Sequence, residues 1–91
     1  MAKVIVTLKI MPESPNSDLI EIGKKVEEEI EKFGGKVGKK EHEPIAFGLK
    51  AIKVYFTMDE NIGSTEELEK NISKIKGVTS VNVEDVRRTI G

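Results

Sequence analysis

Residues 2–33 read AKVIVTLKIMPESPNSDLIEIGKKVEEEIEKF, and within them the spacing of apolar residues changes from two to three or four. Between Ala2 and Ile10 every second residue is apolar, which is typical of a strand with one buried face. A segment with two prolines then breaks the alternation. Beyond it, apolar residues recur at the spacing of an amphipathic helix, at Leu19, Ile22, Val26, Ile30 and Phe33. The stretch therefore predicts a strand followed by a helix.

Both ends of the predicted helix carry signals that set its limits. Ser17 or Asp18 can cap the first turn, and Asp18 with Glu21 has the spacing of a capping box. Gly34 and Gly35 follow the last apolar position, and glycine commonly ends helices because it adopts the left-handed conformation without strain. The helix is therefore expected to end before these glycines.

The next part of the chain predicts two strands. Residues 36–43 are mostly polar and are expected to form a short strand at an edge of a sheet. Residues 46–58 are expected to form a longer strand. Within it, Leu49 and Ala51 are out of phase with the alternation that follows, which predicts a bulge or kink near these two residues.

The last third of the chain completes the predicted fold. Residues 64–67, Ser-Thr-Glu-Glu, have the pattern of a capping box opening a second helix, which Gly77 closes. Residues 78–86 predict a final strand, and residues 87–91 a tail. The order β-α-β-β-α-β predicts an α+β, ferredoxin-like sandwich, in which four antiparallel strands form one sheet and two helices cover one face. The length leaves room for one domain, so residues 1–91 are interpreted as a single domain.

The composition excludes several classes of function. The chain has 15 Lys and Arg against 16 Asp and Glu, so its net charge of −1 gives no overall attraction for nucleic acid or an anionic membrane. The absence of cysteine excludes disulfides, thiolate metal sites and thiol catalysis. No apolar run is long enough to cross a bilayer or to serve as a signal peptide, which predicts a cytoplasmic protein. Lys and Glu supply most of the charge and Gln is absent, a bias associated with work at high temperature.

The residues do not support three common kinds of site. The segment Gly34–Lys39 resembles a phosphate-binding loop, but it follows a helix and no Ser or Thr comes after it. The loop after the first strand has two prolines and no arginine, so it is a poor cradle for an acyl phosphate. His42 is the only imidazole, and in a strand Glu41 and Glu43 point away from it, which argues against a metal site. The chain is expected to bind no nucleotide, metal or cofactor by itself.

The same topology occurs in RNA-recognition motifs, so a small RNA-binding domain is the alternative function. Such domains stack bases on aromatic residues of the first and third strands. The first strand here has no aromatic residue, and the third offers Phe47 and Tyr55 without the motif spacing. Lys3, Lys9 and Lys53 would give the sheet only a mild positive charge. Specific RNA binding is therefore the weaker hypothesis.

Near the C-terminus two acidic residues, Glu84 and Asp85, precede two basic ones, Arg87 and Arg88. One interpretation is an exposed strand end whose charges pair within the chain. The other is a terminus that contacts a partner, since it combines two rigid cations with a free carboxylate. The charges alone favour the first interpretation.

Three segments, in this order and spacing, closely resemble the family of translation elongation factor 1-beta in its short archaeal form: residues 6–14 (VTLKIMPES), 43–52 (EPIAFGLKAI) and 78–88 (VTSVNVEDVRR). The resemblance covers essentially the whole chain, and PIAFGL is its most specific part. It implies a guanine nucleotide exchange factor for elongation factor 1-alpha, the GTPase that delivers aminoacyl-tRNA to the ribosome. Such a factor performs no covalent chemistry, because it acts by binding the nucleotide-free partner more tightly. The free protein is expected to be a monomer.

The resemblance also implies which residues meet the partner. In the family, the loop before the third strand and the C-terminal end both lie on the contact surface. This implies partner-binding roles for Pro44, Ile45, Phe47, Gly48, Arg87 and Arg88. Phe47 matches the loop phenylalanine of the family, an exposed aromatic anchor of the kind found in interface hot spots. Eukaryotic members carry a lysine near the C-terminus that reaches the partner's magnesium region; this chain lacks that lysine, and Glu13 replaces the eukaryotic tryptophan after the first proline.

Overall fold

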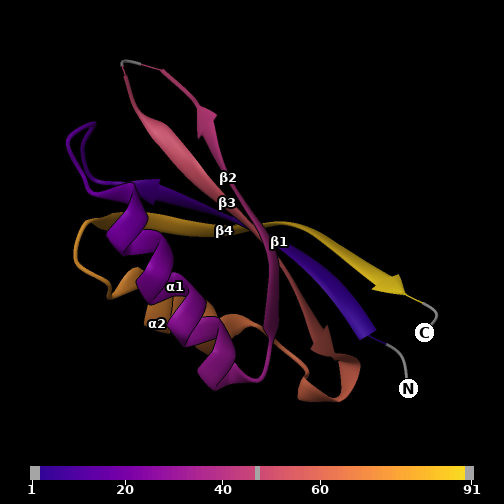
Figure 1. Ribbon diagram of the computed structural model, residues 1–91. Helices are drawn as coiled ribbons and strands as arrows, with labels where there is room; N and C mark the ends of the chain where they lie inside the picture. Colours follow the sequence, from indigo (N-terminus) through magenta and orange to yellow (C-terminus); the bar gives the residue numbers. More distant parts are fainter. Residues whose placement is uncertain (1–2, 47, 90–91) are drawn as a thin grey trace.

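The computed structural model describes residues 3–46 and 48–89, which form four strands, two α-helices and one turn of 3-10 helix (Figure 1). In chain order the elements are β1 (Lys3–Pro12), α1 (Leu19–Phe33), β2 (Lys36–Pro44), β3 (Lys50–Asp59), η1 (Glu60–Ile62), α2 (Glu66–Ser73) and β4 (Val78–Thr89). This succession confirms the predicted β-α-β-β-α-β order.

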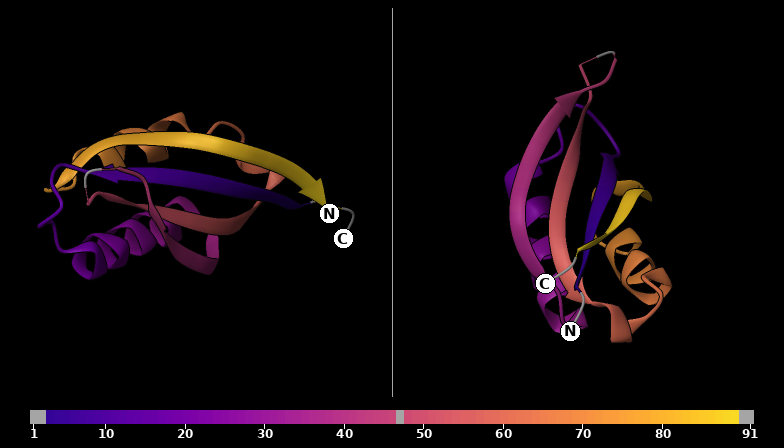
Figure 2. Two further views of the ribbon diagram at one scale, coloured as in Figure 1. Left: turned by 90° about the horizontal axis from the view of Figure 1, so that it is seen from above. Right: turned by 90° about the vertical axis from the view of Figure 1, so that its right-hand side faces the viewer.

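The four strands form one sheet in the order β2-β3-β1-β4, and every neighbouring pair is antiparallel. β1 and β3 are therefore central, while β2 and β4 form the two edges. The sheet is twisted and curved, and both helices lie on the same side of it (Figures 1 and 2). The predicted α+β, ferredoxin-like class is confirmed.

The core lies between the helices and the sheet face that they cover. The residues that alternate in β1 and β3 meet the apolar stripes of α1 and α2, and Phe56 is the largest side chain that is fully buried. The buried members of this cluster are Val6, Leu8, Ile10, Ile22, Val26, Ile30, Ile52, Val54, Phe56, Met58, Leu68, Ile72 and Val78. The alternating residues of the strands and the helically spaced residues of the helices therefore pack into one core. The other face of the sheet, which carries Thr7, Lys9, Lys53 and Tyr55, is called the open face below.

The predicted bulge near Leu49 and Ala51 is wrong. β3 begins only at Lys50, and it pairs with β1 without a shift in register. The main chain turns tightly between the two strands instead: the Ile45 N–H donates to the Leu49 carbonyl and the Leu49 N–H donates to the Ala46 carbonyl, each at 2.9 Å. Leu49 is out of phase because it belongs to this turn and not to the strand. Gly48 has a φ of +77°, a backbone conformation that would be strained for a residue with a side chain.

The structure places register shifts elsewhere, and it lengthens the last strand. One shift lies at Gly38 in β2, and another in β4, where Glu84 is the extra residue between the partners of Thr7 and Leu8. β4 also continues past residue 86 to Thr89, so Arg87 and Arg88 belong to a strand and not to the predicted tail. They pair with the first residues of β1.

The N-terminus of α1 is capped as predicted. One Asp18 carboxylate oxygen accepts hydrogen bonds from the N–H groups of Ile20 and Glu21, both at 3.1 Å. Gly34 ends the helix in the left-handed conformation with a φ of 104°. The second predicted capping box does not form, because the Ser64 hydroxyl accepts from the Glu66 N–H at 3.1 Å instead.

Asp18→Ala is expected to lower the free energy of unfolding by about 1 kcal/mol, because two N–H groups of the first turn lose their acceptor. Urea unfolding followed by circular dichroism measures this change. Glu28→Ala, at an exposed position in the middle of α1, serves as the matched control and is expected to change stability by less than about 0.5 kcal/mol. Equal effects of the two substitutions would show that the cap does not stabilise the helix.

Candidate functional site

The predicted partner-binding residues of the central loop lie at the tip of the β2–β3 hairpin. Pro44 is the last residue of β2, and Ile45 and Gly48 belong to the turn. Ile45 is 40% exposed, and its neighbours Pro44 and Ala46 are exposed as well. Together with Ala46, Leu49 and Lys50 these residues line a shallow cleft of about 160 Å³. Phe47 lies outside the described residues.

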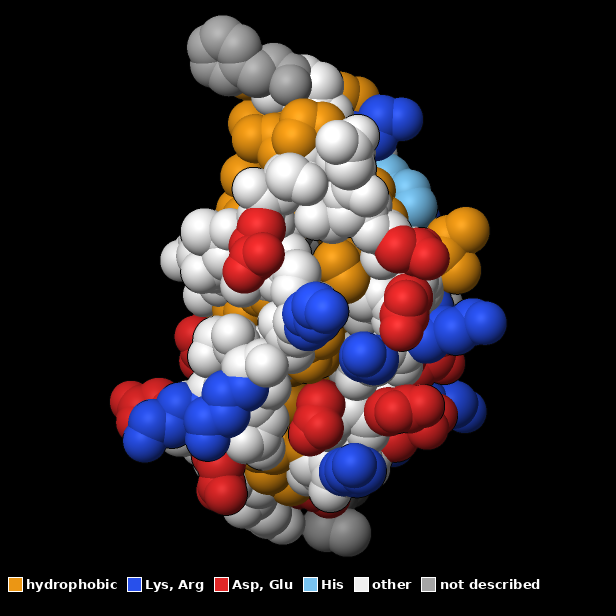
Figure 3. All heavy atoms as spheres, turned by 90° about the vertical axis from the view of Figure 1, so that its left-hand side faces the viewer, with side chains coloured by type: hydrophobic (Ala, Val, Ile, Leu, Met, Phe, Trp, Pro, Cys, Tyr) orange, Lys and Arg blue, Asp and Glu red, His pale blue; other side chains and the backbone are white. Residues whose placement is uncertain are grey.

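The β1–α1 loop meets this tip from the side. A Cβ added to Gly48 would lie 3.8 Å from the Cβ of Pro15, so the turn and the loop are in contact. Figure 3 shows hydrophobic side chains gathered at this end of the molecule, above a surface on which acidic and basic side chains alternate. Sequence reasoning did not assign Pro15 to the site. The predicted topology could have indicated it, because antiparallel pairing brings the end of the first strand, and the loop that follows it, beside the start of the third strand.

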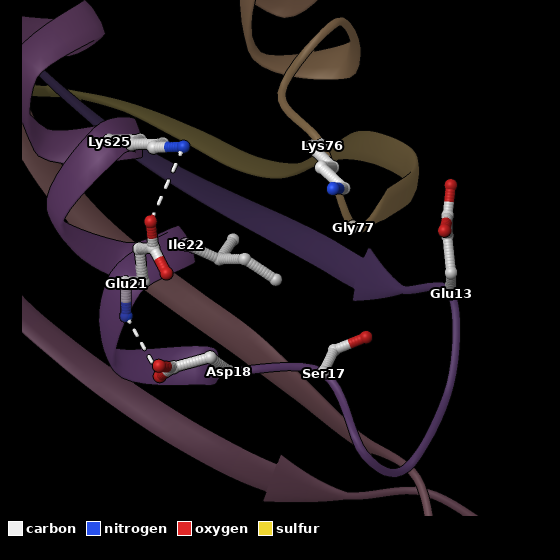
Figure 4. A pocket seen from close by; sticks show the side chains of 8 residues that line it. All are labelled: Glu13, Ser17, Asp18, Glu21, Ile22, Lys25, Lys76 and Gly77. Atoms are coloured by element: carbon white, nitrogen blue, oxygen red, sulfur yellow. Dashed lines mark hydrogen bonds and ion pairs between the residues drawn. The ribbon is translucent and has the colours of Figure 1, made fainter.

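A second cleft, of about 370 Å³, lies between the start of α1 and the turn before β4 (Figure 4). Three of its charged groups have partners within the chain: Asp18 caps the helix, and the Lys25 ammonium lies 3.5 Å from a Glu21 carboxylate oxygen. Lys76 and Glu13 extend from the opposite wall (Figure 4). Acidic and basic side chains both line this cleft and are exposed, so the cleft favours neither an anionic nor a cationic ligand.

The two arginines near the C-terminus lie on opposite faces of β4. Arg87 is paired with Ile5 and points to the open face, whereas Arg88 is paired with Val4 and points to the helix side. Both are exposed and both form ion pairs within the chain. The Arg87 Nε lies 2.8 Å from an Asp85 oxygen, and an Arg88 Nη lies 2.7 Å from a Glu60 oxygen. The first interpretation of these charges, pairing within the chain, is therefore observed.

The hairpin tip and the arginines are at opposite ends of the molecule. In the sheet, Arg88 of β4 is paired with Val4 of β1, and Val4 is paired with Met58 of β3. Met58 lies eight residues along β3 from Lys50, which is next to the tip. Eight residues of strand span about 26 Å. The structure does not bring the two groups together, so a single partner that contacts both must extend along most of the 42 Å length of the molecule.

Ion pairs across the open face tie the strands together. The Lys53 ammonium lies 3.2 Å from Glu43 in β2 and 3.3 Å from Glu84 in β4. The hydrogen bond to Glu43, followed by that to Glu84, raises the pKa of Lys53. One Glu43 carboxylate oxygen is sheltered from solvent, and the Lys53 ammonium at 3.2 Å is its partner.

Tyr55 is held in a second set of contacts on the same face. Its hydroxyl donates a hydrogen bond to Glu41, which lowers the pKa of Glu41 and raises the pKa of Tyr55. The Lys39 ammonium lies 5.6 Å from the centre of the ring. Within residues 3–46 and 48–89, Tyr55 is the only aromatic side chain on the open face, since Phe33 and Phe56 belong to the core side. One ring already covered by chain contacts makes a poor platform for stacked bases.

The other sequence-level candidates have structural roles. Gly34 ends α1 and Lys36 begins β2, so the segment that resembles a phosphate-binding loop joins a helix to a strand, the wrong context for that function. His42 is exposed on the helix side of β2. Glu41 and Glu43 lie on the open face, so they point away from His42 as predicted. In the described part of the chain, no three His, Cys, Asp or Glu side chains gather as metal ligands would. None of its helices is long and apolar enough to cross a membrane.

Comparisons with known proteins agree with this architecture. A solved structure of LarC2, the C-terminal domain of a cyclometallase involved in the synthesis of the NPN cofactor of lactate racemase, superposes with a TM-score of 0.59 at 14% identity. The match covers 99% of this chain and 58% of that one, and at this identity it shows the fold alone. Residues 5–89 match the model of the EF-1 guanine nucleotide exchange domain.

Relatives of nearly the same length carry the name Elongation factor 1-beta. The protein from Methanothermobacter thermautotrophicus is 43% identical, and the match covers 97% of this chain and 98% of that protein. The protein from Staphylothermus marinus is 44% identical with the same coverage. The family match begins at the third residue of β1 and continues to the end of β4, so it includes the hairpin tip and both arginines. The chain therefore belongs to the family of the EF-1 guanine nucleotide exchange domain.

Proposed function

We propose that this protein accelerates the release of guanine nucleotide from elongation factor 1-alpha during translation elongation. The observation that carries the proposal is the family match over residues 5–89, to which relatives named Elongation factor 1-beta add near-complete coverage. The exposed apolar tip of the β2–β3 hairpin supports it, since contiguous apolar residues on a small protein mark an interaction surface.

The proposed mechanism is a difference in binding free energy. A protein that binds the nucleotide-free GTPase more tightly than the nucleotide-bound form weakens nucleotide binding by the same factor. Such a mechanism needs a rigid contact surface and no nucleophile. The proposed contacts are Pro44, Ile45, Phe47 and Gly48 at the tip and, at the other end, the part of β4 that carries Arg87 and Arg88. Since these two groups lie about 26 Å apart, the partner is held at two places along the sheet.

Release of a fluorescent GDP analogue from elongation factor 1-alpha tests the proposal directly. The labelled complex is mixed with excess unlabelled GDP, with and without the protein, and the decay of fluorescence gives the release rate. We expect the rate to rise with protein concentration and to saturate. A small ferredoxin-like domain from another family serves as the control. An unchanged rate at micromolar protein would contradict the proposed function.

RNA binding is the competing function, and the open face does not favour it. Lys53 and Lys39 form ion pairs with carboxylates, and the Lys39 ammonium lies over the Tyr55 ring. Electrophoretic mobility of single-stranded RNA at low and high salt distinguishes the two functions. A tight, strongly salt-dependent shift would support RNA binding, because phosphate contacts release counterions.

Arg87→Ala and Arg88→Ala are expected to slow exchange unequally. The two side chains point to opposite faces of β4, so one partner surface meets only one of them. We expect one substitution to reduce the exchange rate by about tenfold or more and the other by less than about twofold. Single substitutions are preferable to removing residues 87–91, because that deletion would also unpair the start of β1. Equal effects would argue against a contact at one face.

A further inference from the structure

We propose that the outer edge of β4 pairs with the same edge of a second copy of this chain, about a two-fold axis through Val86. β4 is an edge strand of 12 residues that pairs with β1 on one side only within the described part of the chain. Its outer side therefore presents main-chain N–H and C=O groups that a further strand can satisfy.

The open part of this edge is its C-terminal half. α2 lies beside the first half of β4, where Glu66, Glu69, Lys70 and Ser73 line a cleft together with Val81. Beyond that point β4 runs past both helices (Figure 1), and every side chain from Glu84 to Arg88 is exposed. Val86 is 58% exposed although it lies on the apolar face of the sheet, opposite Val6.

The order of charges around Val86 identifies a second copy as the occupant. The sequence Glu84-Asp85-Val86-Arg87-Arg88 is acidic before the valine and basic after it. Two such strands that run antiparallel about Val86 place each Asp85 directly opposite the Arg87 of the other copy, and the two valines opposite each other. Opposite charges in facing positions stabilise an antiparallel pair. A parallel arrangement would instead oppose like charges.

The α2 helices leave room for this arrangement. Asp85 and Arg87 both point to the open face, so the two copies would form a group of two carboxylates and two guanidinium groups there. Val81, which lies beside α2, is five residues from the two-fold axis in each copy. The two α2 helices are therefore about ten strand residues apart, which is roughly 33 Å. A two-fold axis of this kind is the commonest symmetry of homodimers.

The interface is small, so self-association is weak. Only residues 83–89 of each copy face one another, far less area than a stable dimer needs, which gives a dissociation constant on the order of 10⁻⁴ M. The monomer predicted from the sequence then prevails at lower concentrations. This inference does not depend on the proposed function, and its test contains no elongation factor.

Charge reversal tests the pairing through two variants that complement each other. Asp85→Arg gives a chain with cations at both positions, and Arg87→Asp gives a chain with carboxylates at both. Each variant alone opposes like charges, whereas an equimolar mixture restores opposite charges at both contacts. Both positions are exposed, so neither change is expected to disturb folding. Lys24→Glu, on the exposed side of α1, changes the net charge by the same amount as Arg87→Asp and serves as the control.

Sedimentation equilibrium at low salt, from about 10 µM to 1 mM protein, measures the association. We expect the wild type and the control to dimerise, each variant alone to show a dissociation constant raised by more than about tenfold, and the mixture to recover to within about threefold of the wild type. A wild type that stays monomeric over this range would overturn the proposal. So would single variants that dimerise like the wild type, or a mixture that remains monomeric.

Discussion

Replacing Phe56 by alanine is expected to lower the free energy of unfolding by about 3–5 kcal/mol. Phe56 is 1% exposed and lies in the core cluster between the central strand β3 and the helices. Its ring also packs tightly beside the α1–β2 connection, since a Cβ added to Gly35 would lie 2.9 Å from both the Phe56 ring and Ile30. A core this rigid cannot collapse fully around the cavity, so the substitution loses both the buried area and the contacts around it.

Tyr55→Ala provides the matched control for Phe56→Ala. Tyr55 is the preceding residue of the same strand, it is partly exposed, and it points to the open face. We expect it to lose no more than about 1–2 kcal/mol, since one hydrogen bond and partly buried ring contacts are removed. Chemical denaturation of both variants measures the difference. Equal losses would show that the helix-covered face does not dominate the stability of this fold.

Ile45→Asp is expected to weaken binding to nucleotide-free elongation factor 1-alpha by about 2 kcal/mol or more, which is roughly thirtyfold in the dissociation constant. Ile45 is 40% exposed in the turn of the hairpin, and its main-chain N–H holds the turn by donating to the Leu49 carbonyl. A carboxylate at this place would be buried without a partner in an apolar contact, which is costly. In the free protein the same carboxylate remains in water, so stability should change by less than about 1 kcal/mol.

The test of Ile45→Asp combines two measurements, calorimetric titration with the nucleotide-free GTPase and thermal unfolding of the free protein. Ile20→Asp serves as the control, because Ile20 is 68% exposed in the first turn of α1, where an acidic residue is favourable. Wild-type binding by Ile45→Asp would exclude the hairpin tip from the interface. A large loss of stability would assign Ile45 to the fold instead.

The order of elements, the fold class and most of the core could be predicted from the amino-acid sequence. These follow from local patterns: the two-residue period of β1 and β3, the helical spacing of α1, and the cap at Asp18 all depend on residues a few positions apart. The hairpin tip could be singled out because its resemblance to a known family lies in one continuous segment. Its role could therefore be proposed without knowing which residues surround it in the folded protein.

The limits of the strands and the relative placement of the two proposed contact groups could not be predicted from the sequence, because they depend on contacts between distant parts of the chain. The segment Arg87–Thr89 has no apolar alternation, and it is a strand because its main chain pairs with the first residues of β1, more than eighty residues earlier in the chain. The shift in register at Glu84 likewise depends on two strands at once. Because antiparallel pairing sends the end of β4 toward the start of β1 and away from the hairpin tip, the tip and the arginines lie at opposite ends. Distant pairing, which no local pattern encodes, sets that separation.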